Sequence, residues 1–331
     1  MSSEGIVTWH SRQLQHTACS VEACPHPRLG NLVAVASYEL VPDTGARLGQ
    51  VALGVAGPGP EYRHHSALTC AGVLDMKWRH GGDSDPVLAV AESSGAVSLL
   101  SVHQDEEAVC HLETSHSVTV TSGLCLALEW SRLEDRLAVS DSLGAVTVLA
   151  LARGTLEVVA TLPGHSFEAW TVCFSRHEPS TLYSGGDDCK LNCYDLRTSE
   201  QGAVRANKSS HGMGVTSMVS TDSSLLTGSY DEQVREWDLR NIKSEQRGFG
   251  MGGGVWRLKP RPGEPGKLLV AAMHDGFKVV DLGDGGRVVQ EYREHESLAY
   301  GADWVTETST HCVVATCSFY DRMFKVWAFP K

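Results

Sequence analysis

The amino-acid sequence predicts an all-β protein, a β-propeller of seven four-stranded blades. A similar segment recurs at an offset of about 45 residues, the length of one blade. Short apolar runs alternate with glycine- and aspartate-rich turns, and an apolar period of helical type is almost absent. The blades are expected at approximately 20–58, 72–111, 123–162, 164–209, 211–250, 253–291 and 295–331 plus 5–10, within a single domain of residues 1–331.

The clearest repeat lies in two adjacent blades. The first carries His165, Ser184, Asp188 and Tyr194, and the second carries His211, Thr227, Asp231 and Trp237 at equivalent places. A histidine, a serine and an aspartate also form the catalytic set of many hydrolases. Because the set is duplicated one blade later, we expect it to be structural. WD-repeat blades use these residues as one buried hydrogen-bonded chain, so the prediction is a WD-repeat propeller.

The last blade departs from the pattern in two ways. It keeps His295, Asp321 and Trp327 but has Cys317 where serine or threonine is expected. It also has only three strands before the chain ends at Lys331. Residues 6–10 are expected to supply the missing outer strand, so that the N-terminal strand joins the last blade and closes the propeller.

Composition and charge exclude several classes of function. The formal net charge is −12, which argues against a nucleic-acid surface. No apolar stretch is long enough for a membrane span, and the first residues do not resemble a signal peptide. The ten cysteines lie mostly in apolar runs and are expected to be reduced, as in a cytoplasmic protein. Phosphate-loop and metal-enzyme motifs are absent, so we expect no cofactor and no metal.

One face of the propeller is expected to carry the functional site. His274 stands in a turn of the sixth blade where Asp188 and Asp231 stand in their blades, and Met251 replaces the histidine that would bind it. An ionisable residue that departs from the structural pattern in a single blade is a candidate for chemistry. The same face gathers acidic and aromatic residues, namely Glu168, Asp187, Trp170, Tyr230, Trp256, Tyr300 and Tyr320.

Specific strings resemble a known family. In chain order they are 74–78 (LDMKW), 167–170 (FEAW), 183–188 (YSGGDD), 211–215 (HGMGV), 227–232 (TGSYDE), 253–257 (GGVWR), 273–274 (MH), 300–304 (YGADW) and 315–321 (ATCSFYD). The series resembles the diphthine methyltransferase family of WD-repeat proteins, also called diphthine methyl ester hydrolases. The resemblance implies an esterase that removes the methyl ester of methylated diphthine, a modified histidine on translation elongation factor 2. The product is diphthine, which is later amidated to diphthamide.

The implied reaction assigns roles to the candidate residues. His274 is the candidate base, with Glu168 and Asp187 as base or as partners of the trimethylammonium group of the substrate. Tyr230 and Tyr300 are candidates for the pocket or for binding the oxyanion. The remaining aromatic residues, Trp170, Trp256 and Tyr320, are expected to line the substrate pocket.

A second class of function is an interaction module without catalysis. Residues 194–197 (YDLR) and 237–240 (WDLR) resemble the Trp-Asp-x-Arg ends of substrate receptors of cullin-RING ubiquitin ligases. Such a protein would contact a ligase adaptor and release no methanol. An arginine at this position also commonly caps an ordinary strand.

Overall fold

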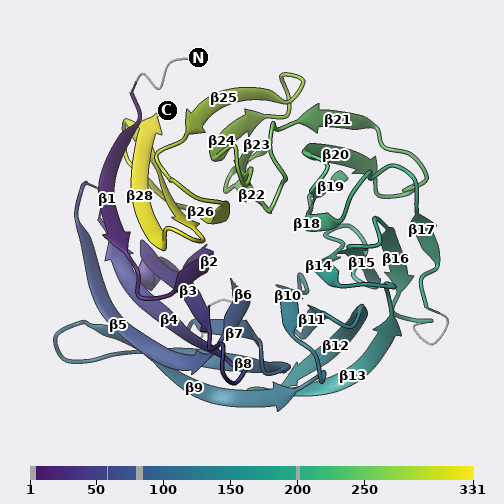
Figure 1. The fold of residues 1–331 in the computed structure, drawn as a ribbon, viewed down its shortest axis with the longest axis horizontal. Helices are drawn as coiled ribbons and strands as arrows, with labels where there is room; N and C mark the ends of the chain where they lie inside the picture. The colour runs from purple at the N-terminus through teal and green to yellow at the C-terminus, as the bar shows by residue number, and fades with distance from the viewer. Residues whose placement is uncertain (1–4, 58, 80–84, 199–201) are drawn as a thin grey trace. The chain divides into compact units, whose positions relative to one another are not determined.

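The predicted all-β, seven-bladed WD-repeat fold class is confirmed. The computed structural model describes residues 5–57, 59–79, 85–198 and 202–331. Its strands form seven four-stranded antiparallel sheets, and one short 3-10 helix, η1 (Pro27–Leu29), follows the second strand (Figure 1).

Each sheet corresponds to one blade. The first three consist of β2 (Thr17–Ala23), β3 (Leu32–Leu40), β4 (Arg47–Ala56) and β5 (Tyr62–Ala71), then β6 (Val73–Trp78), β7 (Val87–Glu92), β8 (Ala96–Gln104) and β9 (Cys110–Thr119), then β10 (Cys125–Trp130), β11 (Arg136–Asp141), β12 (Ala145–Ala152) and β13 (Thr155–Pro163). The next two consist of β14 (Ala169–Phe174), β15 (Thr181–Gly186), β16 (Leu191–Asp195) and β17 (Arg205–Asn207), then β18 (Val215–Ser220), β19 (Ser224–Ser229), β20 (Gln233–Asp238) and β21 (Arg247–Gly250). The last two consist of β22 (Arg257–Arg261), β23 (Glu264–Ala271), β24 (Phe277–Asp281) and β25 (Arg287–Tyr292), then β26 (Ala299–Glu307), β27 (His311–Ser318), β28 (Met323–Pro330) and β1 (Val7–Gln13).

The outer strands of the first two blades run beyond the limits expected from the sequence. The strand β5 ends at Ala71, whereas the first blade was expected to end at 58. The strand β9 ends at Thr119, beyond the expected 111. The Gly-Pro-Gly-Pro string at 57–60 is typical of a turn, but β4 before it and β5 after it pair in one sheet, so the string does not mark a blade boundary.

The N-terminal strand joins the last blade as predicted. β1 pairs with β28 in antiparallel register from Val7 opposite Ala328 to Gln13 opposite Met323. The next residues are held as well, because Arg322 donates a hydrogen bond to the carbonyl oxygen of Gln15 at 2.9 Å. The strand therefore covers the edge that β28 would otherwise expose.

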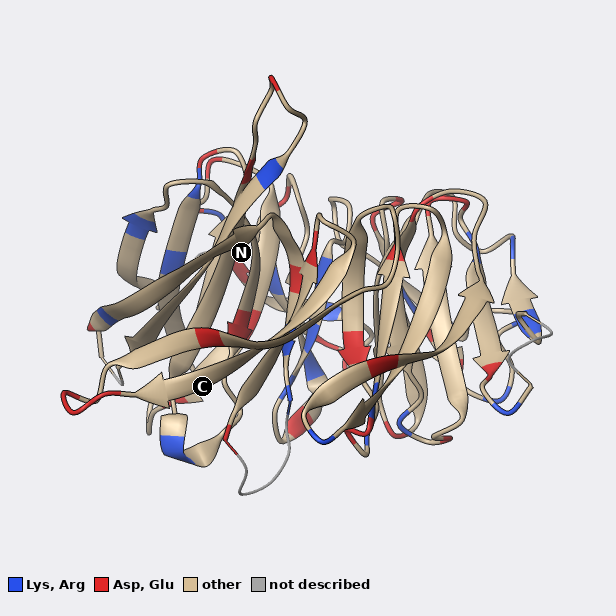
Figure 2. Ribbon diagram, turned by 90° about the horizontal axis from the view of Figure 1, so that it is seen from below, with Lys and Arg blue, Asp and Glu red and all other residues tan. Residues whose placement is uncertain are grey.

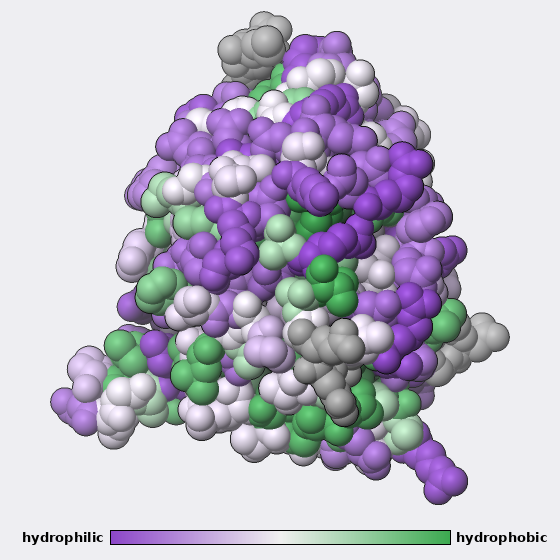
Figure 3. Space-filling model, turned by 90° about the vertical axis from the view of Figure 1, so that its right-hand side faces the viewer, coloured by the Kyte–Doolittle hydropathy of each residue, from purple (hydrophilic) through white to green (hydrophobic). Residues whose placement is uncertain are grey.

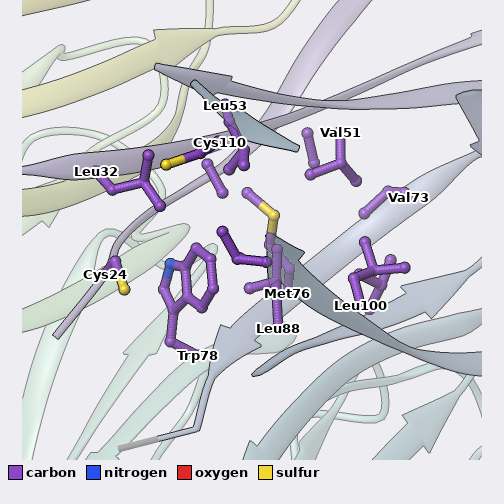
Figure 4. Packing of buried hydrophobic residues seen from close by; sticks show 14 of the residues in the cluster. Cys24, Leu32, Val51, Leu53, Val73, Met76, Trp78, Leu88, Leu100 and Cys110 are labelled. Atoms are coloured by element: carbon purple, nitrogen blue, oxygen red, sulfur yellow. The ribbon is translucent and has the colours of Figure 1, made fainter. Parts of the chain in front are cut away.

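The chain forms two compact units, and each has its own apolar core. The first unit contains residues 1–90, 99–115 and 259–331, and the second contains 91–98 and 116–258. In the first unit, Trp78 and Met76 of β6 pack against Leu32, Leu53 and Leu88 of the neighbouring strands (Figure 4). In the second unit, adjacent residues of one strand face different clusters, with Leu182 in one and Tyr183 in the other. This is the alternation that period-two apolar runs predict.

A buried group of charges lies in the first unit. Glu22 Oε1 is 2.9 Å from Lys77 Nζ and 2.6 Å from Lys259 Nζ, and the three residues come from β2, β6 and β22. Burial opposes ionisation of Glu22, but the two ammonium groups outweigh it and lower the pKa of the carboxyl. Asp75 and Asp303 complete the group at 3.1 and 3.2 Å from the same lysines. Buried charges are tolerated when they are paired in this way.

Charged residues of both signs are interspersed along strands and loops in Figure 2. The face drawn in Figure 3 is mainly hydrophilic, with hydrophobic groups gathered toward its lower edge. Eight of the cysteines are buried and all ten are free, as expected for reduced core residues. None of the helices within the described part of the chain is long and apolar enough to cross a membrane.

The repeated hydrogen-bonded set is confirmed in the fourth blade. His165 Nδ1 lies 2.7 Å from Asp188 Oδ1, and His165 Nε2 lies 2.7 Å from Ser184 Oγ. Ser184 in turn contacts the hydroxyl of Tyr194 at 3.1 Å. Burial opposes ionisation of Asp188, but hydrogen bonds from Lys190 and His165 outweigh it and lower the pKa of the carboxyl to about 2.

In the fifth blade the set is only partly formed. Thr227 Oγ1 lies 2.9 Å from His211 Nε2 and accepts a hydrogen bond of 2.9 Å from Trp237 Nε1. The carboxylate of Asp231, however, binds Arg235 at 2.9 Å and the backbone N–H of Gly212 at 2.8 Å. Among the described residues, His211 Nδ1 has no hydrogen-bonding partner. The expected bond between Asp231 and His211 is therefore wrong, because the guanidinium of Arg235 occupies the carboxylate.

In the seventh blade the buried hydroxyl belongs to Thr316, and the expectation that Cys317 takes this place is wrong. Thr316 Oγ1 lies 2.9 Å from His295 Nε2 and accepts a hydrogen bond from Trp327 Nε1 at 3.1 Å. The hairpin explains the shift. The last paired residues before its turn are Cys317 and Phe324, one residue further apart in the chain than Gly185 and Leu191 in the fourth blade.

Removal of the N-terminal strand should destabilise the protein. Deletion of residues 1–12 removes most of β1 and exposes the edge of β28, so we expect a lower melting temperature and aggregation on heating. The measurement is a thermal unfolding curve, with deletion of residues 1–5 as the control. An unchanged melting temperature in the longer deletion would contradict the role of this strand.

The buried histidines should make stability fall in mild acid. Burial lowers the pKa of His211 to about 4 and that of His295 to about 3, whereas an unfolded histidine titrates near 6.5. The unfolded chain therefore binds more protons below pH 6.5, and each histidine should remove about 2 kcal/mol of unfolding free energy between pH 7 and pH 5.

Urea unfolding at both pH values measures this effect. His211→Gln should be less stable at pH 7 but should lose roughly 2 kcal/mol less than the parent protein between the two pH values. An equal loss in parent and variant would contradict the assignment to His211.

Candidate functional site

The innermost strands begin with a β-bulge that redirects one side chain. In the second unit, the register shifts between Ala169 and Thr171 and between Val215 and Ser217, which leaves Trp170 and Thr216 as the extra residues. In the first unit, the register of β26 shifts between Ala299 and Gly301, which makes Tyr300 the extra residue there. Bulges aim side chains away from the regular pleat and are common beside functional sites. Sequence reasoning missed them, because an extra strand residue has no local sequence signature.

Three predicted aromatic residues meet in the second unit. The ring of Trp170 lies 5.7 Å from that of Trp256 and 6.5 Å from that of Tyr230, measured between centroids. Tyr230 and Trp256 are 6.0 Å apart. The Trp170 ring is steeply inclined to both neighbours, at 61° and 90°. The rings thus form a corner, which we call the aromatic corner, and each of them is half-buried.

Two predicted acidic residues adjoin the aromatic corner. Trp170 Nε1 donates a hydrogen bond to Asp187 Oδ1 at 3.2 Å, and Asp187 is exposed. The backbone N–H of Asp187 donates to the carbonyl oxygen of Glu168 at 2.8 Å, which fixes the turn next to the entry of β14. Glu168 is half-buried. The structure therefore brings the carboxylate of Asp187 and the backbone of Glu168 next to the aromatic corner.

Gly214 makes room for this arrangement. A Cβ atom at this position would lie 2.7 Å from Asp187 Oδ1 and 3.2 Å from Tyr230 Cδ2. The carbonyl oxygen of Gly214 also accepts a hydrogen bond from the N–H of Tyr230 at 3.0 Å. The glycine therefore holds the turn that carries Tyr230 close to the turn that carries Asp187.

Aromatic faces beside a carboxylate are suited to a quaternary ammonium ion. Such a cation binds to ring faces through their negative electrostatic potential, and it cannot donate a hydrogen bond. Asp187 supplies a negative charge at the edge of the aromatic corner, and Trp170 holds that charge in place. The arrangement can bind a trimethylammonium group by charge and by contact.

The other predicted aromatic residues lie together in the first unit. The ring of Phe319 lies 4.9 Å from that of Tyr300 and 5.0 Å from that of Tyr320. Tyr38, which sequence reasoning did not single out, lies 5.7 Å from the same phenylalanine. Burial raises the pKa of Tyr300 to about 12, so its phenol stays protonated and able to donate a hydrogen bond at neutral pH. Tyr320 is 71% exposed.

His274 is exposed in the turn between β23 and β24 of the first unit. Ala271 pairs with Phe277 as Gly185 pairs with Leu191, so the two turns have equal length and His274 occupies the place of Asp188, as predicted. Among the described residues, His274 has no hydrogen-bonding partner.

The residues on either side of His274 hold this turn. Asp275 forms an ion pair with Lys278 at 2.6 Å and another with Arg293. Met273 forms a β-bridge to Ala299, directly before Tyr300. The histidine is thus presented to solvent from a turn that other residues fix.

The described residues contain no group of three or more His, Cys, Asp or Glu side chains arranged to hold a metal ion.

Comparisons with known proteins agree with the fold. The family described as "WD domain, G-beta repeat" matches residues 156–195 and 204–238. A chain in the solved structure "Crystal Structure of Mitotic Checkpoint Complex" superimposes with a TM-score of 0.74 at 17% identity, covering 98% of this chain and 92% of that one. At this identity the likeness shows the fold alone.

Similar proteins of known name show which family the chain belongs to. A diphthine methyltransferase of Schizosaccharomyces pombe is 32% identical over 337 residues, covering 99% of both chains. The chain belongs to the diphthine methyltransferase family. The mouse diphthine methyltransferase is 35% identical over 328 residues, covering 87% of this chain and 67% of that protein. The human one is 32% identical, with coverage of 87% and 72%.

The aromatic corner of this protein should bind small quaternary ammonium ions. We expect tetramethylammonium chloride to change the tryptophan fluorescence in a saturable way, and Trp170→Leu to weaken the binding by roughly tenfold, since cation–π contacts are worth about 1–2 kcal/mol. Gly214→Ala should also weaken binding, because it displaces the Asp187 carboxylate. Trp9→Leu, which alters a tryptophan of β1, is the control. Equal affinity in Trp170→Leu and the parent protein would contradict a cation site at the corner.

Proposed function

We propose that this protein hydrolyses the methyl ester of methylated diphthine on translation elongation factor 2, giving diphthine. The observation that carries the proposal is a family match over nearly the whole chain, combined with the aromatic corner and its carboxylate. The relatives are named diphthine methyltransferases. Diphthine is a modified side chain that carries a trimethylammonium group. The corner has the chemistry that this group requires.

Ester hydrolysis needs a base, a water molecule and a group that stabilises the oxyanion. A base takes a proton from water, which attacks the ester carbonyl carbon and forms a tetrahedral oxyanion. The oxyanion collapses, the bond to the methoxy group breaks, and the leaving oxygen takes the proton back to form methanol. The acid that forms releases its remaining proton to solvent, so the products are a carboxylate, methanol and a proton, and no oxidant or reductant is consumed.

The proposal assigns these roles to named residues. His274 is the proposed base, because an imidazole can accept a proton from water and this side chain is solvent-accessible. Tyr300 is the proposed donor to the oxyanion, since burial keeps its phenol protonated. Asp187 is proposed to hold the substrate cation, together with Trp170, Tyr230 and Trp256, and Glu168 adds negative charge beside it. Tyr320, which is exposed beside Phe319, is proposed to contact the substrate as well.

The decisive experiment measures methanol release under single-turnover conditions from elongation factor 2 that carries the methylated intermediate. His274→Ala should fold normally and lose at least about 100-fold in rate, the lower range for removal of a general base. His103→Ala, which changes another exposed histidine, should retain the parent rate. Asp187→Asn and Glu168→Gln should weaken substrate binding without unfolding the protein.

Two outcomes would contradict the proposal. If the parent protein released no methanol, the hydrolase function would be wrong. If His274→Ala released methanol at the parent rate, the base would have to be another residue.

The alternative of a ligase adaptor has less support. The N–H groups of Arg197 and Arg240 bind Asp195 and Asp238 of their own strands at 2.8 and 2.7 Å, the usual role of a residue that caps a strand. The COP1 ubiquitin ligase of Arabidopsis thaliana is 34% identical over 116 residues, covering 35% of this chain but 17% of that protein. This short match fits a shared repeat.

A further inference from the structure

Three exposed apolar side chains follow one another along successive blades of the second unit. Leu143 lies in the turn between β11 and β12 and is 63% exposed. Phe167 lies directly before β14 and is 61% exposed, and Met213 lies before β18 and is 53% exposed. We call these three residues the apolar row. Exposed apolar side chains that occur together on a soluble protein commonly mark an interaction surface.

The apolar row is continuous with the aromatic corner. A Cβ atom on Gly144 would lie 2.6 Å from the carbonyl oxygen of Phe167, so the turn of Leu143 packs directly on the segment of Phe167. The next residue, Glu168, accepts a hydrogen bond from Asp187, which borders Gly214. Met213 precedes Gly214, and its carbonyl oxygen accepts a hydrogen bond from Ser229 at 3.1 Å.

The backbone beneath the apolar row is held by one aspartate per blade. Asp141 Oδ1 accepts hydrogen bonds from the N–H groups of Leu143 and Ala145 at 3.0 and 2.9 Å. Asp188 accepts one from Ser166, next to Phe167, at 3.0 Å. Asp231 accepts one from Gly212, next to Met213, at 2.8 Å. The three side chains therefore project from fixed loops, and their exposure is built into the fold. Fixed apolar groups bind a partner with little loss of loop entropy.

The charges beside the apolar row indicate the kind of partner. Glu168 and Asp187 adjoin Phe167 and the aromatic corner, so the surface combines apolar contact with negative charge. The ammonium group of Lys190, beside Ser166 and Asp188, is paired with Asp188 at 2.8 Å. The complementary ligand is a polypeptide segment with apolar side chains flanking one cationic side chain.

We propose that the apolar row of Leu143, Phe167 and Met213 binds the polypeptide segment of the protein substrate on either side of its cationic esterified residue. This inference rests on the proposed function and names how that substrate is recognised. A small ester would occupy the aromatic corner without touching the row. Contacts with the row would then contribute to binding of the protein substrate alone.

The test compares two substrates in one triple variant. In Leu143→Ser/Phe167→Ser/Met213→Ser, we expect KM for the esterified elongation factor to rise at least about tenfold, as expected when interface anchors are removed. Hydrolysis of a small methyl ester that carries a trimethylammonium group should stay at the parent rate. Leu133→Ser is the matched control, because Leu133 is 72% exposed at the other end of β11. Melting curves of all variants should coincide.

A binding measurement separates failure of this inference from failure of the proposed function. The affinity for the esterified elongation factor, measured by fluorescence anisotropy, should fall in the triple variant and be unchanged in Leu133→Ser. If methanol is never released but this pattern of affinities holds, the hydrolase function is wrong and the docking surface stands. If the triple variant binds the elongation factor as tightly as the parent, the docking surface is wrong, whatever the activity. Equal losses on both substrates would likewise overturn it.

Discussion

The aspartate in the hairpin turn of a blade holds the loop that leads into its innermost strand, and the candidate site depends on this contact. Asp188 binds the N–H of Ser166, Asp231 binds that of Gly212, and Asp321 binds that of Glu296 at 3.1 Å. A carboxylate that accepts backbone N–H groups keeps its negative charge and fixes the donor segment. The loops of Ser166 and Glu296 lead into the strands that carry the candidate residues Trp170 and Tyr300. Without the aspartates, neither the bulge residues nor the exposed loop residues would have a defined direction.

Structural residues and candidate site residues alternate along these turns. Asp187 precedes Asp188, Tyr230 precedes Asp231, and Tyr320 precedes Asp321. The second member of each pair accepts a hydrogen bond from a backbone N–H of its own blade, whereas the first belongs to one of the aromatic groups or adjoins it. Each of these turns therefore carries a structural carboxylate and a candidate site residue side by side. The blade with His274 departs from this scheme, since Asp275, one residue later, takes over the ion pairs.

Sequence reasoning succeeded where a feature repeats from blade to blade. The fold class, the pairing of the N-terminal strand with the last blade and the set around His165 follow from the repeat. It failed where one residue is inserted, since the longer hairpin of the last blade moves the buried hydroxyl from Cys317 to Thr316. It also failed where another side chain competes for the same partner, since Asp231 binds Arg235 instead of His211. The bulges, and with them the direction of Trp170, arise from register and could not be read from local sequence.

The central claim is that neighbouring aspartates have opposite roles, and the comparison of Asp187→Ala with Asp188→Ala tests it directly. Unfolding free energy and methanol release are measured on both variants. Asp188→Ala should lose about 1–3 kcal/mol of stability, because a buried histidine loses its partner. Asp187→Ala should keep the parent stability and lose substrate affinity, because its carboxylate is exposed beside the aromatic corner. The reverse pattern, with a stable Asp188→Ala and an unfolded Asp187→Ala, would contradict this account.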